Sequence, residues 1–146
     1  MTRAVQKIVE ANTLLSGLRF ESGGLAAAHA VHNGLTALPA THDYTHGDKV
    51  NLGTLTQLAL EDTSTAEIHE FIVFCTGVGL PTTLEEVGLR DPDRDDLMTV
   101  ANTATMPSET IHNMPFPVDA EIVCGAIRRG RVRSSVPRGH RQTLSC

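Results

Sequence analysis

The feature that most constrains this chain is a run of alanines and histidines within residues 20–49 that favours a helix. The run holds four of the seven histidines: His29, His32, His42 and His46. Alanine, leucine and valine dominate from Leu25 to Val31, and no proline interrupts the pattern before Pro39. At about 3.6 residues per turn, His29 and His32 share one face of the expected helix.

A metal site is one way to use these histidines. His46 lies just before the next expected helix, and a histidine there can converge with one on the preceding helix. Neutral imidazole is the commonest metal ligand, so convergence would indicate zinc or iron. A catalytic metal needs a third protein ligand, which the residues leave open among His32, His42, Asp43 or a carboxylate from elsewhere. The alternative is that the histidines are buried and satisfied by hydrogen bonds.

Composition favours helices over sheets. The 146 residues are enough for one domain with a core. Aromatic residues make up only 3%, so the core must consist mainly of Leu, Val, Ile and Ala, which suits close helix packing. No apolar run approaches about 20 residues and no secretory signal is visible at the start, so we expect a cytoplasmic protein without a membrane span. Its three cysteines would be reduced, with Cys75 in the core.

The apolar periodicity predicts an all-α helical bundle. Helices are expected at about residues 5–18, 25–38, 48–60, 95–104 and 118–127, and a further one follows a cap at Thr63 or Ser64. Ser22-Gly23-Gly24 is expected to interrupt the helical structure between the first two helices. The expected inward positions are Ile8, Ala11, Leu15 and Leu18; Val50, Leu55, Leu58 and Ala59; Ile68, Phe71, Ile72 and Cys75; and Leu97, Val100 and Ala101.

The charges divide the chain at about residue 128. Six of the twelve Lys and Arg lie at or after Arg128, whereas no Asp or Glu follows Glu121. Such an asymmetry can indicate a nucleic-acid-binding arm. The segment lacks interleaved aromatic residues and any apolar period, so we expect a disordered tail over residues 128–146 and no nucleic-acid partner.

Several long segments resemble the glycerol dehydrogenases of the iron-containing (metal-dependent) alcohol dehydrogenase family. The resemblance covers about Val5 to Ile127. The segments that carry it are Phe20–Gly34, His46–Val50, Val9–Asn12 with Leu15–Gly17, Gly53–Leu55 with Gln57-Leu58, Val78–Pro81, and Glu109–Pro115.

The resemblance implies a fold and a set of ligands. It implies that residues 1–127 form a bundle like the C-terminal domain of the iron-containing alcohol dehydrogenase and dehydroquinate synthase-like fold. The family holds a divalent metal through one aspartate and two histidines, and the histidines fall on His29 and His46, with His29 also near the substrate. The aspartate and the α/β domain that binds NAD have no counterpart in this sequence. We therefore expect a bundle truncated on its N-terminal side.

The function implied is that of an NAD-dependent oxidoreductase acting on glycerol or another small polyol. Zinc or iron would lower the pKa of the substrate hydroxyl, and NAD would accept hydride, giving dihydroxyacetone from glycerol. His32 and His112 are candidates for residues beside the metal ligands. The isolated chain is expected to be inactive, and it could form homo-oligomers. The alternative is a non-enzymatic helical module that binds metal or another subunit.

Overall fold

The computed structural model describes residues 2–22 and 25–133, with side chains over 2–15 and 25–129. Within these ranges the chain is entirely helical and contains no strand, which confirms the all-α prediction. Its elements are α1 (Arg3–Ser22), α2 (Ala27–Thr36), η1 (Pro39–Thr41), α3 (His46–Leu60), α4 (Thr65–Gly77), η2 (Glu85–Val87), α5 (Arg94–Ala104), η3 (Thr110–Asn113) and α6 (Ala120–Arg133), where η marks a short 3-10 helix.

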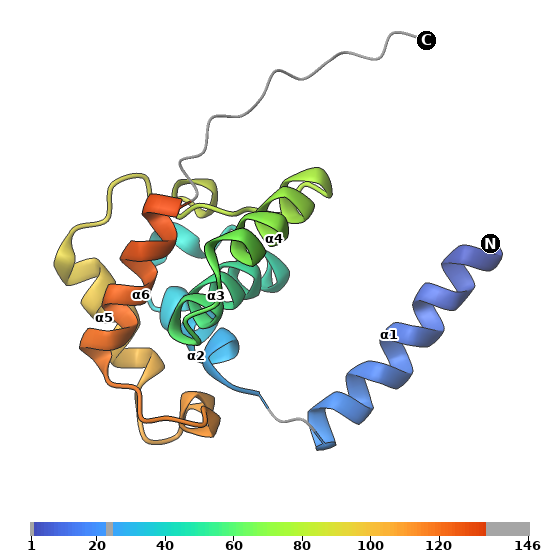
Figure 1. The fold of residues 1–146 in the computed structure, drawn as a ribbon, viewed down its shortest axis with the longest axis horizontal. Coiled ribbons are helices and arrows are strands. Elements are labelled where there is room, and N and C mark those ends of the chain that lie inside the picture. Colours follow the sequence, from blue (N-terminus) through green and yellow to red (C-terminus); the bar gives the residue numbers. More distant parts are fainter. Residues whose placement is uncertain (1, 23–24, 134–146) are drawn as a thin grey trace, which may run out of the picture.

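Helix α2 is the central element of the bundle (Figure 1). It contacts α3, α5 and η3, while α3 and α5 both contact α6. The alanine-rich sequence of α2 explains this position, because small side chains allow neighbouring helices to come close. The largest fully buried side chains include Val31, Leu35, Val87, Val100, Ile111 and Val123.

Two glycines set the distance between α2 and its neighbours. A Cβ atom on Gly53 of α3 would meet the backbone carbonyl oxygen of Ala28, and one on Gly34 of α2 would meet that of Val100 on α5. Backbone atoms cannot turn aside as a flexible side chain can, so both positions require glycine. Since His29 follows Ala28, the close approach at Gly53 also fixes the histidine-bearing face of α2 beside α3.

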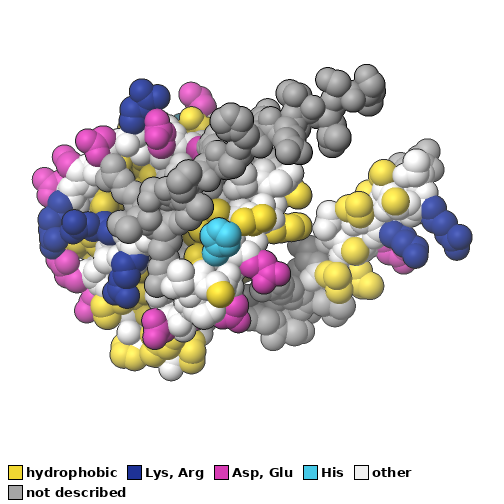
Figure 2. All heavy atoms as spheres, turned by 45° about the horizontal axis from the view of Figure 1, so that its top comes forward, with side chains coloured by type: hydrophobic (Ala, Val, Ile, Leu, Met, Phe, Trp, Pro, Cys, Tyr) yellow, Lys and Arg dark blue, Asp and Glu magenta, His cyan; other side chains and the backbone are white. Residues whose placement is uncertain are grey.

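Helix α1 differs from the sequence prediction. Its apolar stripe was expected to face a core, but Ile8 and Leu15 are each 60% exposed and Ala11 is exposed too. The helix stands apart from the α2–α6 bundle (Figure 1), and its hydrophobic side chains project from its surface (Figure 2). The periodicity identified the helix and its apolar side, but periodicity cannot show which element covers that side.

The prediction for α3 was also partly wrong. Of the four positions expected to point inward, Leu55 is buried and Leu58 is half-buried and packs against the core. Val50 and Ala59 are only half-buried. The buried residues of α3 include polar and small ones instead: Lys49, Asn51, Leu52, Gly53, Leu55 and Thr56. The polar members are satisfied internally, since the Lys49 ammonium donates to the Thr41 carbonyl and the Asn51 amide donates to that of Pro81.

Other expectations for the helices are confirmed. Ser64 caps α4, Ile68 and Cys75 are buried on it, and Leu97, Val100 and Ala101 are buried on α5. The Cys75 thiol donates to the Asn51 side-chain oxygen at 3.3 Å, and burial raises the pKa of this thiol. Across the described helices, none combines the length and hydrophobicity that crossing a bilayer would need.

The C-terminal boundary lies later than expected. Helix α6 was predicted to end at about residue 127, but it continues to Arg133, so its last turns include residues assigned to the basic tail. Three predictions are not tested by the structure. Residues 134–146, expected to be disordered, and the expected breaker at Gly23-Gly24 lie outside the described residues, and Leu18 lies outside the described side chains.

Candidate metal centre

Three imidazole rings lie together where α2 meets the first turn of α3. His29 and His32 are on α2, and His46 is the first residue of α3. The ring centroids of His29 and His46 are 5.3 Å apart, those of His32 and His46 4.3 Å, and those of His29 and His32 6.3 Å. Two consecutive helices thus present three histidines to one small region of the surface.

A capping box holds His46 in place. The Thr45 hydroxyl oxygen accepts a hydrogen bond from the Asp48 N–H at 3.3 Å, and the Asp48 carboxylate accepts one from the Thr45 N–H at 2.9 Å. These bonds satisfy two N–H groups at the helix start, where no intrahelical partner exists. Helix α3 therefore begins at His46 rather than at Asp48, as the sequence had suggested, and the backbone that carries the His46 ring is helical.

A chain of hydrogen bonds leads away from His46, and we call its four side chains the His46–Glu109 chain. His46 Nδ1 lies 3.1 Å from His32 Nε2, and His32 Nδ1 lies 3.0 Å from Asn33 Oδ1. Asn33 Nδ2 donates to Glu109 Oε2 at 2.9 Å. Glu109 immediately precedes η3. The His46–Glu109 chain therefore joins α3 and α2 to a segment that lies 76 residues after Asn33.

The environment of His29 and His32 favours the neutral form of these two rings. Burial lowers the pKa of His29, and the positive charge that His46 would carry lowers it further. Burial also lowers the pKa of His32, a shift that its hydrogen bond to Asn33 opposes and the charges of His46, Lys49 and His29 reinforce. Neutral imidazole is the form that binds a metal ion.

The two other third-ligand candidates near α2 do not join the three rings. His42 Nε2 donates to the Thr36 carbonyl oxygen at 3.0 Å, which directs that ring to the end of α2. Asp43 is exposed in the turn after η1. His32 does lie in the cluster, but its Nε2 is engaged with His46.

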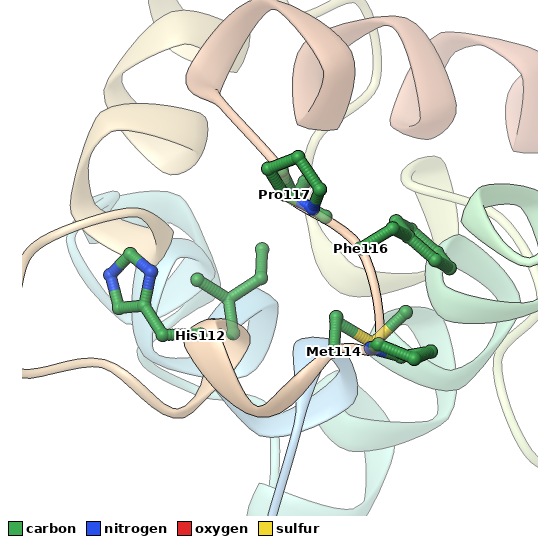
Figure 3. Close-up of a pocket in the computed structure, with 7 residues that line it drawn as sticks. His112, Met114, Phe116 and Pro117 are labelled. Carbon is green, nitrogen blue, oxygen red and sulfur yellow. The ribbon is translucent and has the colours of Figure 1, made fainter.

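The structure places His112 in a different part of the bundle. Its Nε2 donates to the Met106 carbonyl oxygen at 3.0 Å. The ring borders a pocket of about 270 Å³ that Met114, Phe116 and Pro117 also line (Figure 3). The neighbouring Asn113 instead fastens η3 to the start of α2, since its amide donates to the Leu25 carbonyl at 2.6 Å.

The donors at the cluster suit a metal, but they are incomplete within the described residues. His29 and His46 offer imidazole nitrogens, which zinc and iron both accept. Among the side chains that the structure describes, those of residues 2–15 and 25–129, no group of three or more from His, Cys, Asp or Glu is arranged to hold a metal ion. The pair therefore fits as part of a ligand set whose remaining member is not supplied by these residues.

Sequence reasoning did not find Asn33 and Glu109. Spacing along the chain cannot relate two residues 76 positions apart. One signal was nevertheless available, because both lie within segments that carry the family resemblance. A polar residue next to a candidate helical histidine, such as Asn33, could have been examined as its hydrogen-bond partner.

Comparison with known proteins supports the resemblance. A glycolaldehyde reductase from Halobacterium salinarum is 58% identical over 127 residues, which cover 87% of this chain and 35% of that protein. A glycerol dehydrogenase from Thermotoga maritima is 55% identical over 140 residues, covering 93% of this chain and 38% of that protein. No protein-family model matches the chain.

The fold agrees with the sequence comparison. The crystal structure of a probable glycerol dehydrogenase from Sinorhizobium meliloti superposes with a TM-score of 0.88 at 43% identity, covering 94% of this chain and 39% of that one. The chain thus spans little more than a third of the length of the curated relatives described above. In sequence and in structure the chain matches a C-terminal portion of the glycerol dehydrogenase family.

Proposed function

We propose that this chain supplies two of the metal ligands, His29 and His46, of an NAD-dependent alcohol dehydrogenase that acts on glycerol or another small polyol. The observation that carries the proposal is the 5.3 Å separation of these two rings on consecutive helices. Both histidines lie in the segments that resemble the family. The lowered pKa of His29 supports the same assignment, because it keeps that ring neutral and able to bind metal.

The residues of this chain would bind the metal ion and orient the substrate, and they would not themselves transfer hydride. A divalent metal held here, zinc or iron, would supply a positive charge that polarises a substrate hydroxyl and lowers its pKa. His29 is half-buried and His46 exposed, so substrate can approach the pair from the solvent side. His29 would also contact the bound polyol, as the resemblance implies.

The names of the relatives narrow the substrate class that we propose. One relative is a glycolaldehyde reductase and others are glycerol dehydrogenases. These compounds share a short carbon chain with a hydroxyl next to the reacting carbon. We therefore propose a small polyol or hydroxyaldehyde for the whole protein. NAD would be bound by residues outside this sequence, since it contains no Gly-rich strand–turn–helix pattern.

Zinc titration followed by calorimetry tests the metal ligands. Wild-type chain should bind one zinc ion, and His29→Ala and His46→Ala should each abolish detectable binding. His69→Ala is the matched control, because His69 is an exposed histidine on α4. Equal zinc affinity in His29→Ala, His46→Ala and His69→Ala would refute the assignment.

A second proposal concerns the 146 residues alone: they do not oxidise glycerol without further polypeptide. The support is the two-histidine ligand set and the missing dinucleotide pattern described above. The measurement is NADH formation by the purified chain with glycerol, NAD and zinc. Turnover above a protein-free blank would overturn this proposal. The non-enzymatic alternative, a subunit-interaction module, is favoured by the exposed apolar side chains of α1 and is tested by the association experiment described in the Discussion.

A further inference from the structure

The His46–Glu109 chain has only one consistent arrangement of hydrogen atoms when its histidines are neutral. A carboxylate can only accept, so the Asn33 amide nitrogen must point at Glu109, as it does at 2.9 Å. The amide oxygen of Asn33 then faces His32 Nδ1 at 3.0 Å. Because that oxygen cannot donate, His32 Nδ1 must carry the hydrogen.

The hydrogen on the His46 ring is fixed in the same way. A neutral ring has a single N–H, so His32 Nε2 is an acceptor. His46 Nδ1 lies 3.1 Å from it and must be the donor. With the hydrogen on Nδ1, the lone pair of His46 is on Nε2. The opposite tautomer would set two lone pairs against each other across this short distance.

We propose that Asn33 and Glu109, acting through His32, are positioning residues that hold His46 as the Nδ1–H tautomer with its Nε2 lone pair free for a metal ion. This inference rests on the proposed metal site. Metal-binding histidines commonly donate their second N–H to a partner that fixes ring and tautomer. Here the partner of His46 is a third imidazole, that of His32. The Glu109 carboxylate lies two hydrogen bonds beyond His32, through Asn33.

The His46–Glu109 chain links the segment around η3 to the first turn of α3. Glu109 is attached to η3, and η3 is fastened to the start of α2 by the Thr110 hydroxyl, which donates to the Ala26 carbonyl at 2.8 Å. Movement of this segment would remove the acceptor for Asn33. The orientation of His46 at the start of α3 is therefore set from two other elements.

Nitrogen-15 NMR of the metal-free chain of 146 residues tests the tautomers directly. The couplings between ring nitrogens and ring carbon-bound hydrogens should assign the hydrogen to Nδ1 in both His32 and His46. An Nε2–H form of His46, or an equal mixture of the two forms, would overturn the proposal. This readout needs no metal, so it stays informative whatever the zinc titration gives.

Substitutions test the role of the two positioning residues. Asn33→Ala and Glu109→Ala should each give a tautomer mixture at His46 and weaken zinc binding by about 10- to 100-fold. Glu109→Gln should restore both properties, since its amide oxygen still accepts from Asn33. His69→Ala again serves as the control and should change neither.

The outcomes separate this proposal from the metal site itself. If wild type binds zinc and loses it in His29→Ala, while Asn33→Ala and Glu109→Ala bind as wild type does, the metal site holds and the positioning role is refuted. If the tautomers are as expected and shift in both variants, but wild type binds no zinc, the arrangement is supported and the metal assignment fails.

Discussion

At the scale of single residues, Gly53 controls how α2 meets α3. A methyl group at this position would meet the Ala28 carbonyl oxygen, and the two helices would have to separate. We expect Gly53→Ala to lower the free energy of unfolding by about 1–3 kcal/mol, as measured by urea denaturation. Zinc affinity should fall as well, because His29 moves with α2.

Gly125 provides the control for this substitution. Nothing lies within 4 Å of a Cβ atom placed there, and it is inside helix α6. Gly125→Ala should therefore stabilise the chain by about 0.5–1 kcal/mol. If Gly53→Ala proved as stable as Gly125→Ala, the close contact between α2 and α3 would be absent in solution.

The histidine cluster predicts a pH dependence of stability. The pKa values of His29 and His32 are lowered from 6.5 in the folded chain. The unfolded chain therefore takes up protons first as the pH falls, so the folded state loses stability below the unfolded pKa of about 6.5. Urea midpoints of the metal-free chain should be lower at about pH 5.5 than at about pH 7.5.

A variant that lacks both His29 and His32 is the comparison for that measurement. The double substitution His29→Gln and His32→Gln removes both groups with lowered pKa, so its midpoints should depend less on pH over the same interval. An equal slope in wild type and the double variant would mean that the two rings titrate as they do in the unfolded chain. The matched substitution His69→Gln should leave the wild-type slope unchanged.

At the scale of elements, the capping box of α3 connects helix stability to metal binding. Thr45→Ala should cost about 1 kcal/mol of stability, measured by thermal unfolding followed by circular dichroism. It should also weaken zinc binding several-fold, because the first residue of the helix is His46. The physical reason is fraying of the first turn, which lets the His46 ring leave the cluster.

Helix α4 offers a matched cap that is remote from the cluster. Ser64 makes the same type of capping box with Glu67. Ser64→Ala should destabilise the chain by a similar amount but leave zinc affinity unchanged. A loss of zinc affinity in both variants would show that general stability, rather than the position of His46, controls binding.

The sequence predicted the positions of most helices. It did not always predict which residues of a helix are buried. Apolar periodicity located α4 and α5 together with their inward residues, because those helices bury one regular stripe. For α3 it identified Leu55 and Leu58 but missed Lys49, Asn51 and Gly53, which are buried by close packing and internal hydrogen bonds. Hydrophobicity alone cannot distinguish a polar residue that finds a partner inside the bundle from one that faces solvent.

At the scale of the whole molecule, the prediction of the histidine cluster used two kinds of sequence information. The helical spacing placed His29 and His32 on one face, and the position of His46 before the next expected helix allowed it to converge with them. The family resemblance then implied that His29 and His46 are the metal ligands. Neither could include Glu109, since its contact with Asn33 depends on how η3 folds back on α2. Long-range contacts of this kind follow from tertiary packing and leave no periodic signal in the sequence.

The exposed side of α1 gives a prediction for the whole chain. Ile8 and Leu15, each 60% exposed, belong to an apolar stripe on a helix that stands apart from the bundle (Figures 1 and 2). Clustered exposed apolar side chains favour association. We expect the chain to self-associate with rising concentration in sedimentation experiments, and the double substitution Ile8→Glu and Leu15→Glu to reduce this association.

The same double substitution should leave the stability of the bundle almost unchanged. Substitutions at exposed positions usually alter stability by less than about 0.5 kcal/mol, whereas Leu35→Ala, at a side chain only 1% exposed, should cost about 2–5 kcal/mol. Urea denaturation of the two variants at low protein concentration makes the comparison. A loss of stability in Ile8→Glu/Leu15→Glu as large as in Leu35→Ala would show that α1 packs onto the bundle in solution. Its apolar stripe would then be part of the core and could not drive association between chains.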